Sequence, residues 1–182
     1  MPGLGVNIAI TQDGQILLTQ REDFEVWCLP GGEVDAGETI AQAAVREALE
    51  ETGLEVQLTR LVGLYSRPRN DNFAGHIALF AANPVGGTLR PQLGEVIGLD
   101  YFSPEELPDE LIPWHRQRIR DAFAGLGGSV VWAQSSHWGL DPALTRQEVY
   151  DLRDRSGLSR ADFFRRFMGA NEPSAGIQEV GP

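Results

Sequence analysis

The sequence predicts an α/β fold with a helical extension at its C-terminal end. Three features predict it: a β-rich hairpin near the start, a well-capped helix after it, and further β-rich runs leading to a second amphipathic helix. The chain has 182 residues, 42% of them hydrophobic, which is enough for one domain with a sizeable core plus an appendage.

The hairpin is predicted from residues 5–11 and 15–20, two runs of β-forming residues joined by a Gln-Asp-Gly turn. Residues 25–29 then form a short apolar approach to a Pro-Gly-Gly turn. Two adjacent glycines allow the backbone to approach a ligand closely or to offer a carbonyl oxygen to a metal. Gly32, the second of them, is therefore a candidate metal ligand.

The helix after this turn is predicted from its ends. Thr39 and Gln42 fit a capping box at the N-terminus, and Gly53 occupies the place of a left-handed C-cap residue. Further strands are expected at residues 56–65 and 76–82, because both runs are apolar and rich in β-forming residues. The segment between these two strands contains Pro, Gly and several polar residues, and we expect it to be a loop.

Residues 112–125 form the second predicted helix, and residues 127–133 a last strand. Helical spacing assigns an apolar side to this helix and a polar side to its arginines, Arg116, Arg118 and Arg120. The main domain is accordingly expected to span residues 1–133.

The helical extension is predicted over residues 134–169, with Thr145 and Ser159 as N-caps of two helices. Its apolar residues need a cover, which the main domain, a partner or a second subunit in a homodimer would supply. Residues 170–182 have no periodicity, so we expect a disordered tail.

Composition excludes several functional classes. A net charge of −11 argues against neutralising nucleic-acid phosphates or an anionic membrane. No run is apolar and long enough for a membrane span, and the first residues do not have the pattern of a signal peptide, so a cytoplasmic location is expected. The single cysteine, Cys28, lies among apolar residues and is expected in the core.

The first helix carries three carboxylates, Glu47, Glu50 and Glu51, at i, i+3 and i+4. One interpretation is a solvated acidic face, which most charge runs are. The other is a platform for divalent cations, because hard cations take oxygen ligands and would remove the repulsion. Arg46 precedes Glu50 by four residues and can orient it.

The same stretch resembles the signature of the Nudix hydrolases: Gly, five residues, Glu, seven residues, Arg-Glu, an aliphatic residue, any residue, Glu-Glu, any residue, Gly, an aliphatic residue. The matching residues are Gly32, Glu38, Arg46, Glu47, Glu50, Glu51, Gly53 and Leu54. Ala48 is smaller than the aliphatic residue that the pattern has at its place. So many identities at fixed spacing make the match specific, and the resemblance extends over roughly residues 5–133.

The resemblance implies an α/β/α sandwich with a mixed sheet, and an enzyme that hydrolyses a phosphoanhydride in a nucleoside diphosphate linked to another group. It implies Mg²⁺, or Mn²⁺, held by Glu47, Glu50, Glu51 and Gly32. A carboxylate accepts the proton of the attacking water, and Glu50, Glu51 and Glu95 all remain candidates. Glu38 and Arg46 are expected to hold the loop and helix together.

The candidates for substrate contact lie outside the signature. Arg21, Arg67 and Arg69 can bind phosphate or ribose, and Tyr65 can stack on a base. Each has an ordinary alternative as an exposed arginine or a core aromatic. Compounds of the ADP-ribose type, nucleoside triphosphates and dinucleoside polyphosphates all remain open as substrates.

A ligand-sensing transcriptional regulator is the alternative function. Some relatives couple a Nudix domain to a DNA-binding unit, and the extension has six arginines against four acidic residues between 145 and 168. The helix pair is short for a winged helix, however, and a sensor has no need of all three glutamates. We therefore expect an enzyme acting on a nucleotide-type small molecule.

Overall fold

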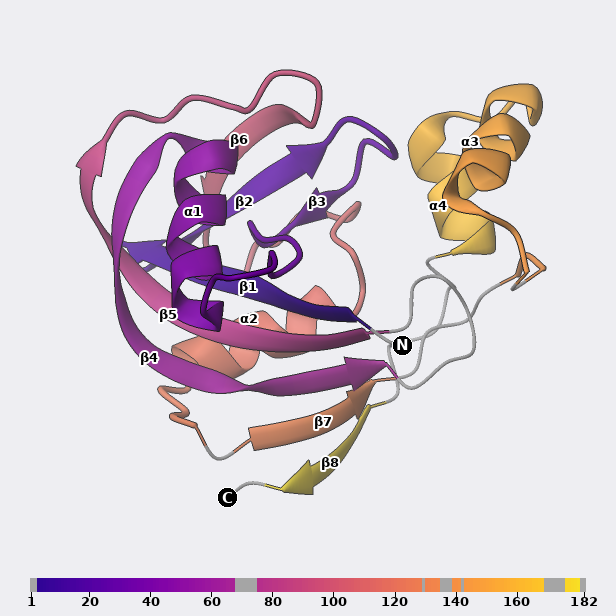
Figure 1. The fold of residues 1–182 in the computed structure, drawn as a ribbon. Helices are drawn as coiled ribbons and strands as arrows, with labels where there is room; N and C mark the ends of the chain where they lie inside the picture. The colour runs from indigo at the N-terminus through magenta and orange to yellow at the C-terminus, as the bar shows by residue number, and fades with distance from the viewer. Residues whose placement is uncertain are drawn as a thin grey trace.

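A computed structural model describes residues 3–67, 75–128, 130–134, 139–141, 143–168 and 176–180. A twisted sheet forms the centre of the molecule, and a pair of helices lies at one end of it (Figure 1). The elements in chain order are β1 Gly3–Gln12, β2 Gln15–Arg21, β3 Trp27–Cys28, α1 Ile40–Thr52, β4 Leu54–Arg67, β5 Gly75–Gly87, β6 Val96–Phe102, α2 His115–Phe123, β7 Val130–Gln134, α3 Arg146–Arg155, α4 Arg160–Phe167 and β8 Gly176–Val180.

The sheet is mixed, as the resemblance implies. Its strands follow the order β3-β2-β1-β5-β4-β7-β8, and β6 pairs with β2 outside this path. β1 runs parallel to β5 and β4 runs parallel to β7, whereas β4 and β5 form a long antiparallel pair. The strand predicted at residues 76–82 is longer than expected, because β5 continues its pairing with β4 to Gly87.

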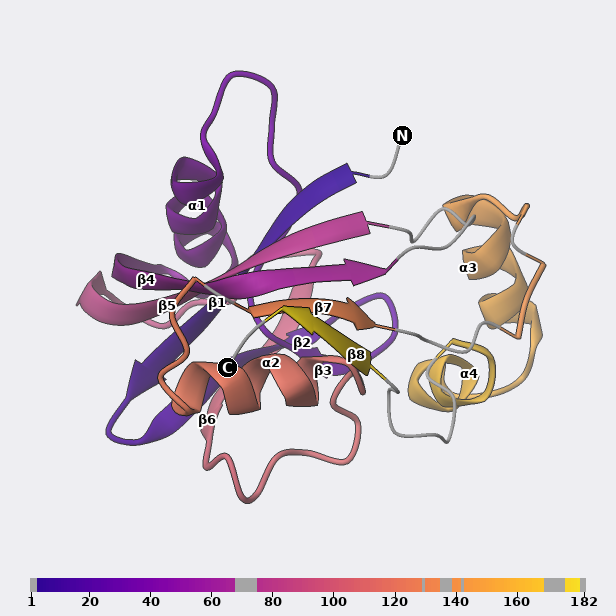
Figure 2. The same cartoon turned by 90° about the horizontal axis from the view of Figure 1, so that it is seen from below.

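One helix covers each face of the sheet (Figure 2). α1 packs its small residues Ala43, Ala44 and Ala48 on one face, where the core includes Val6, Ile8 and Phe80. α2 packs Ile119 and Ala122 on the other face, with Leu18, Leu79 and Tyr65. The expected α/β/α sandwich is therefore confirmed. Ala48, the small residue in the signature, lets α1 lie close to the strands beneath it.

The ends of α2 differ from the prediction. The helix was expected from residue 112, but Ile112 still donates a backbone hydrogen bond to the Trp27 carbonyl at 2.9 Å. This pairing with β3, followed by Pro113, delays the first helical turn until His115. The assignment of Arg116, Arg118 and Arg120 to the polar side of this helix was wrong for Arg118, which is only 2% exposed.

The expectation of a disordered tail over residues 170–182 was wrong for Gly176–Val180. This segment is β8, which pairs antiparallel with β7 at the edge of the sheet. Without β8, the edge strand β7 would present a row of backbone N–H and C=O groups without partners. The five residues of β8 pair with these groups through their backbone, which requires no hydrophobic pattern in the sequence. The main sheet therefore takes its last strand from beyond the extension, and does not end at residue 133.

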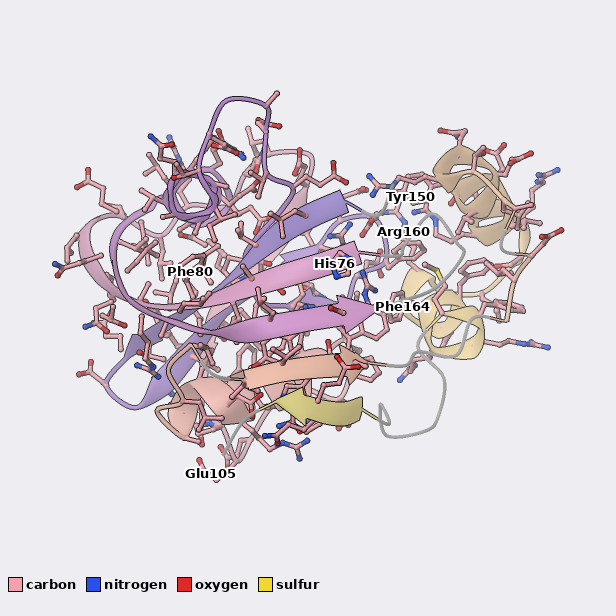
Figure 3. All side chains as sticks on the ribbon, turned by 60° about the horizontal axis from the view of Figure 1, so that its bottom comes forward. His76, Phe80, Glu105, Tyr150, Arg160 and Phe164 are labelled. Atoms are coloured by element: carbon pink, nitrogen blue, oxygen red, sulfur yellow. The ribbon has the colours of Figure 1, made fainter. Side chains whose placement is uncertain are left out.

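The extension packs against the main domain, which is one of the covers that its apolar residues were expected to need. Phe163, Phe164 and Met168 are buried together with Phe24 and Trp114 of the main domain. Figure 3 shows Tyr150, Arg160 and Phe164 directed from α3 and α4 toward the sheet. Polar contacts reinforce the interface: Tyr150 Oη lies 3.2 Å from Asp23 Oδ2, and Arg160 Nη1 lies 2.5 Å from Glu22 Oε1. None of the helices in the described ranges is long and apolar enough to cross a membrane.

Candidate active site

Helix α1 is fixed at both ends by the predicted caps. The Thr39 hydroxyl accepts from the Gln42 N–H, and the Gln42 side chain accepts from the Thr39 N–H at 2.8 Å. Gly53 has a φ of 74° and its N–H donates to the Leu49 carbonyl. These caps satisfy backbone groups that the helix leaves free, and they fix where its glutamates stand.

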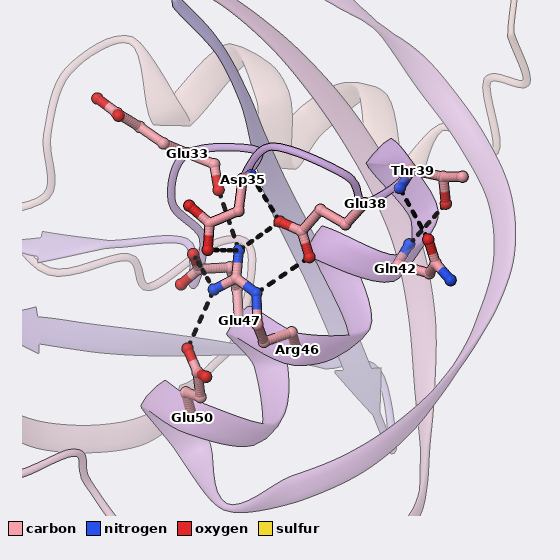
Figure 4. Close-up of polar contacts among 8 residues, drawn as sticks. All are labelled: Glu33, Asp35, Glu38, Thr39, Gln42, Arg46, Glu47 and Glu50. Atoms are coloured by element: carbon pink, nitrogen blue, oxygen red, sulfur yellow. Dashed lines mark hydrogen bonds and ion pairs between the residues drawn. The ribbon is translucent and has the colours of Figure 1, made fainter.

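Arg46 is the centre of the polar network on this helix (Figure 4). Its guanidinium makes a bidentate contact with Glu38, at 2.6 Å for Nη2 to Oε1 and 3.1 Å for Nε to Oε2. It also reaches Glu47 at 2.8 Å, Glu50 at 3.1 Å and the Glu33 carbonyl at 3.1 Å. The hydrogen bonds from Arg46 lower the pKa of Glu38. Arg46 thus ties the loop to the helix and orients two of the three helix carboxylates.

Gly31 and Gly32 bring the preceding turn against these carboxylates. Gly31 has a φ of 148°, and a Cβ atom there would lie 2.1 Å from the Val6 carbonyl oxygen. A Cβ at Gly32 would instead lie 2.3 Å from Glu47 Oε1. Only glycine lets the turn sit this close to both β1 and the helix.

Glu51 is the most enclosed of the three carboxylates, with 9% of its surface exposed. Its Oε2 accepts a hydrogen bond from the Gly31 N–H at 3.1 Å. Burial raises its pKa to about 7, and the charges of Glu47 and Glu95 add to that effect against the opposing Gly31 hydrogen bond and Arg21 charge. Burial also raises the pKa of Glu47, against the opposing effect of Arg46. A buried carboxylate among like charges is what a bound cation would stabilise.

A cavity of about 200 Å³ begins at Gly31 and extends between the main domain and the extension. Its lining combines cations with aromatic rings: Arg21, Arg67, Arg118 and Arg146 on the one hand, and Phe24, Trp114, Tyr150 and Phe164 on the other. Since the Gly31 N–H binds Glu51, the cavity adjoins the carboxylate helix. A concave site with apolar walls and a few polar groups is the usual form of a ligand site.

A family model described as the NUDIX domain matches residues 1–122. The chain belongs to the Nudix hydrolase family. It is 40% identical over 114 residues to a Bacillus subtilis protein named "Putative 8-oxo-dGTP diphosphatase", a match covering 63% of this chain and 74% of that protein. It is 35% identical over 125 residues to an ADP-ribose pyrophosphatase of Methanocaldococcus jannaschii, covering 66% of this chain and 72% of the relative.

Solved structures agree with this assignment. An ADP-ribose pyrophosphatase from Streptococcus suis superposes with a TM-score of 0.61 at 28% identity, covering 69% of this chain and 92% of the other. The expected class, a Nudix-type pyrophosphohydrolase, agrees with the activities named for these relatives. The family model ends at residue 122, so the helices α3 and α4 lie outside the matched Nudix region.

The Nudix signature residues form a set of oxygen donors. In the described part of the chain no three His, Cys, Asp or Glu side chains converge as they would around a metal, because Arg46 holds Glu47 and Glu50. The donor chemistry nevertheless fits Mg²⁺ or Mn²⁺: three carboxylates on adjacent helical positions and the Gly32 carbonyl, all oxygen. That carbonyl accepts from Val6 N at 2.9 Å, which leaves its second lone pair.

The residues predicted to contact substrate or to act as base differ in where they lie relative to the cavity. Arg21 lines the cavity, but it is paired with Asp23 at 2.6 Å, and its charge reaches Glu51. Arg67 lies in the cavity wall with its guanidinium 4.9 Å from the Trp114 ring. Arg69 falls outside the described residues. Glu95 is exposed, and its charge helps to raise the pKa of both Glu47 and Glu51.

The assignment of Tyr65 to base stacking was wrong. Its side chain is fully buried, and its hydroxyl donates to Asp121 Oδ2 at 2.6 Å. Tyr65 is the last residue of the strand predicted at residues 56–65, but β4 runs on to Arg67. The Tyr65 ring points into the core on the α2 side of the sheet. The Tyr65 ring supports the Arg118 guanidinium, whose central carbon lies 5.3 Å from the ring centroid.

Sequence reasoning missed Asn7, His115 and Arg118 in the cavity wall, and Gln134, which accepts a hydrogen bond from Arg118. One signal was available, because Trp114, Arg118 and Ala122 are spaced by four and share one helical stripe. Trp114 and Ala122 are apolar and buried, so the stripe that they share with Arg118 lies on the buried side of the helix. The partners of Arg118 on β1 and β7 have no local signal in the sequence.

Proposed function

We propose that this protein hydrolyses a phosphoanhydride bond in a nucleoside diphosphate linked to another group, with Mg²⁺ or Mn²⁺ bound at Glu47, Glu50, Glu51 and the Gly32 carbonyl. The observation that carries the proposal is the carboxylate pair of buried Glu51 and partly buried Glu47, which stands beside a cavity lined by arginines. The names of the relatives, diphosphatase and pyrophosphatase, support the same class of bond.

Each group of the site has a task in this chemistry. The divalent cation, when bound, supplies charge neutralisation for the phosphate oxygens and lowers the pKa of the attacking water. Gly31 and Gly32 let the turn lie close to the carboxylates, and Arg21 on the cavity side offers a cation to a diphosphate bound beside them. Arg46 positions Glu47 and Glu50 and does not itself contact substrate.

The base that accepts the proton of water is one of Glu50, Glu51 and Glu95. Glu50 is held by Arg46, and Glu51 accepts from Gly31. Glu95 is exposed, and its charge is felt by both Glu47 and Glu51. We assign the role to Glu95, because no hydrogen bond within the described ranges holds its carboxylate, whereas Glu50 and Glu51 each accept one.

The regulator alternative receives less support from the extension. Arg153, Arg160 and Arg165 contact Asp23, Glu22 and Glu110 of the main domain, so half of its six arginines face the protein. An arginine engaged in this way is not available to DNA phosphates. ADP-ribose-type compounds, nucleoside triphosphates and dinucleoside polyphosphates all fit the class of bond proposed.

The test is metal-dependent hydrolysis by the wild type and by Glu51→Gln. Glu55→Gln is the matched control, because Glu55 is an exposed residue of β4. Glu51→Gln should fold normally and lose about 100-fold or more in kcat, because an amide is a poor ligand for a hard cation. Glu55→Gln should retain full activity. Equal activity of both variants would show that the carboxylates are a charged surface without a metal role.

A further inference from the structure

The inner end of the cavity is built around Arg118, which is 2% exposed. Its guanidinium is held by neutral oxygens, with Nη1 at 2.6 Å from Asn7 Oδ1 and Nη2 at 2.8 Å from Gln134 Oε1. Its Nε has no hydrogen-bond partner, and no carboxylate of the described ranges forms an ion pair with it. Burial and the nearby charge of Arg67 lower its pKa to about 9, so it stays a cation at neutral pH.

His115 adds a second donor at the same place. Its Nδ1 accepts the Leu29 N–H at 3.0 Å, and burial holds its pKa well below the usual value, so the ring is neutral. A neutral imidazole that accepts at Nδ1 carries its hydrogen on Nε2. Nε2 lies 3.4 Å from Arg118 Nη1, where two donors face each other and make no hydrogen bond. Both groups therefore offer hydrogens to an acceptor that the described residues do not provide.

The walls around these donors are largely aromatic, and two of the aromatic residues come from the extension. Trp114 belongs to the turn before α2, while Tyr150 and Phe164 belong to α3 and α4. A volume of about 200 Å³ is smaller than the roughly 300–1,000 Å³ typical of a whole-ligand pocket. A cavity of this size would hold one planar part of a substrate and leave the diphosphate outside it, at Gly31 and the carboxylate helix.

We propose that this cavity binds the nucleobase of the substrate, and that Arg118 and His115 select a base with a carbonyl edge over a base with an amino edge. The inference rests on the proposed function for the identity of the substrate as a nucleotide. A 6-oxopurine presents two acceptors, O6 and N7, side by side, whereas adenine presents a donor at N6 beside N7. The adenine amino group would face the N–H donors of Arg118 and His115, and neither side would find a hydrogen-bond acceptor.

Binding by the full chain without metal tests this directly. Isothermal titration compares inosine 5′-monophosphate with adenosine 5′-monophosphate, which share the sugar and phosphate and differ in the base, where O6 and N1–H stand in place of the 6-amino group and the unprotonated N1. The wild type should bind the inosine nucleotide at least about tenfold more tightly. Arg118→Met should remove that preference, and Arg118→Lys should reduce it, since lysine keeps the charge without the fork of donors. Arg120→Met, on the exposed side of α2, should leave it unchanged.

Tyr150→Ala should weaken the binding of both nucleotides by a similar factor, because the substitution removes one wall of the cavity and leaves the donors of Arg118 and His115 in place. Equal affinity of the wild type for the two nucleotides would overturn the proposal. So would an Arg118→Met variant that loses affinity for both equally, which would indicate a contact with phosphate. Glu51→Gln should keep the base preference even where hydrolysis is lost, so a failure of the proposed hydrolysis and a failure of base selection give different results.

Discussion

The close approach of Gly32 to Glu47 makes Gly32→Ala a sharp probe of the carboxylate site. The new Cβ would stand 2.3 Å from Glu47 Oε1, whereas real Cβ atoms almost never come within 3.0 Å of another heavy atom. The three atoms nearest to that Cβ all belong to the Glu47 carboxylate, the far end of a flexible side chain. The carboxylate therefore has to retreat by at least about 0.7 Å, while the backbone stays in place.

This displacement exceeds what a metal site tolerates, since ligand distances hold to within about 0.2 Å. We expect kcat/KM to fall by about 100-fold, as for other misplacements near 1 Å. Half-saturation by Mg²⁺ should need at least about tenfold more metal. Gly→Ala at a compatible φ stabilises a protein by about 0.4–1 kcal/mol, so the melting temperature should not fall.

The assay is a Mg²⁺ titration of initial hydrolysis rates, with a thermal melt of each variant. Gly3→Ala in β1 is the matched control, because a Cβ there meets nothing within 4 Å. It should behave as the wild type in both measurements. A stable Gly32→Ala variant with unchanged metal dependence and kcat/KM would refute the idea that the Glu47 carboxylate must occupy its observed position.

Three further predictions concern the frame around the site. Gly31→Ala should lower the melting temperature strongly, because its Cβ would meet the Val6 backbone at 2.1 Å and backbone cannot yield as a side chain does; an unchanged melt would contradict this. Phe164→Ala should cost about 3–5 kcal/mol of packing, so hydrogen exchange should lose protection in α3 and α4 but not in β5, whereas exposed Leu152→Ala should change little. Because burial lowers the pKa of His115, the unfolded state gains this proton first as pH falls below about 6.5, and the contribution of His115 to stability drops from there, while the raised pKa of Glu51 acts in the opposite direction. Denaturant titrations between pH 7 and 5 should therefore show His115→Asn gaining stability relative to the wild type as pH falls; a difference that does not change with pH would contradict the role assigned to burial.

The parts of the structure that could be predicted from the sequence are those with local signals. Thr39, Gln42 and Gly53 define the ends of α1 without any tertiary contact, and the spacing of Glu47, Glu50 and Glu51 places them on one side of a helix. The approach of Arg46 to Glu50 is an i, i+4 contact of the same kind.

The parts that could not be predicted depend on contacts between distant segments. Tyr65 reads as a strand-end aromatic, but its partner Asp121 is 56 residues away. β8 forms because β7 presents an open edge for it to pair with. The five residues of β8 have no periodicity that would predict this pairing. The cavity likewise arises only when α3 and α4 pack over residues 22–26, so its lining residues are scattered through the sequence.

Hydrolysis of a nucleoside diphosphate derivative in ¹⁸O-labelled water, with and without Mg²⁺, tests whether water attacks a phosphoanhydride with the help of a metal. This mechanism predicts one ¹⁸O atom in a phosphate product released by cleavage of the P–O–P linkage, with no product when the metal is chelated. Phosphomonoesters should remain uncut under the same conditions, because they offer no second phosphate to bridge. Cleavage that persists with chelator, or label found only in the product of a simple monoester, would contradict it.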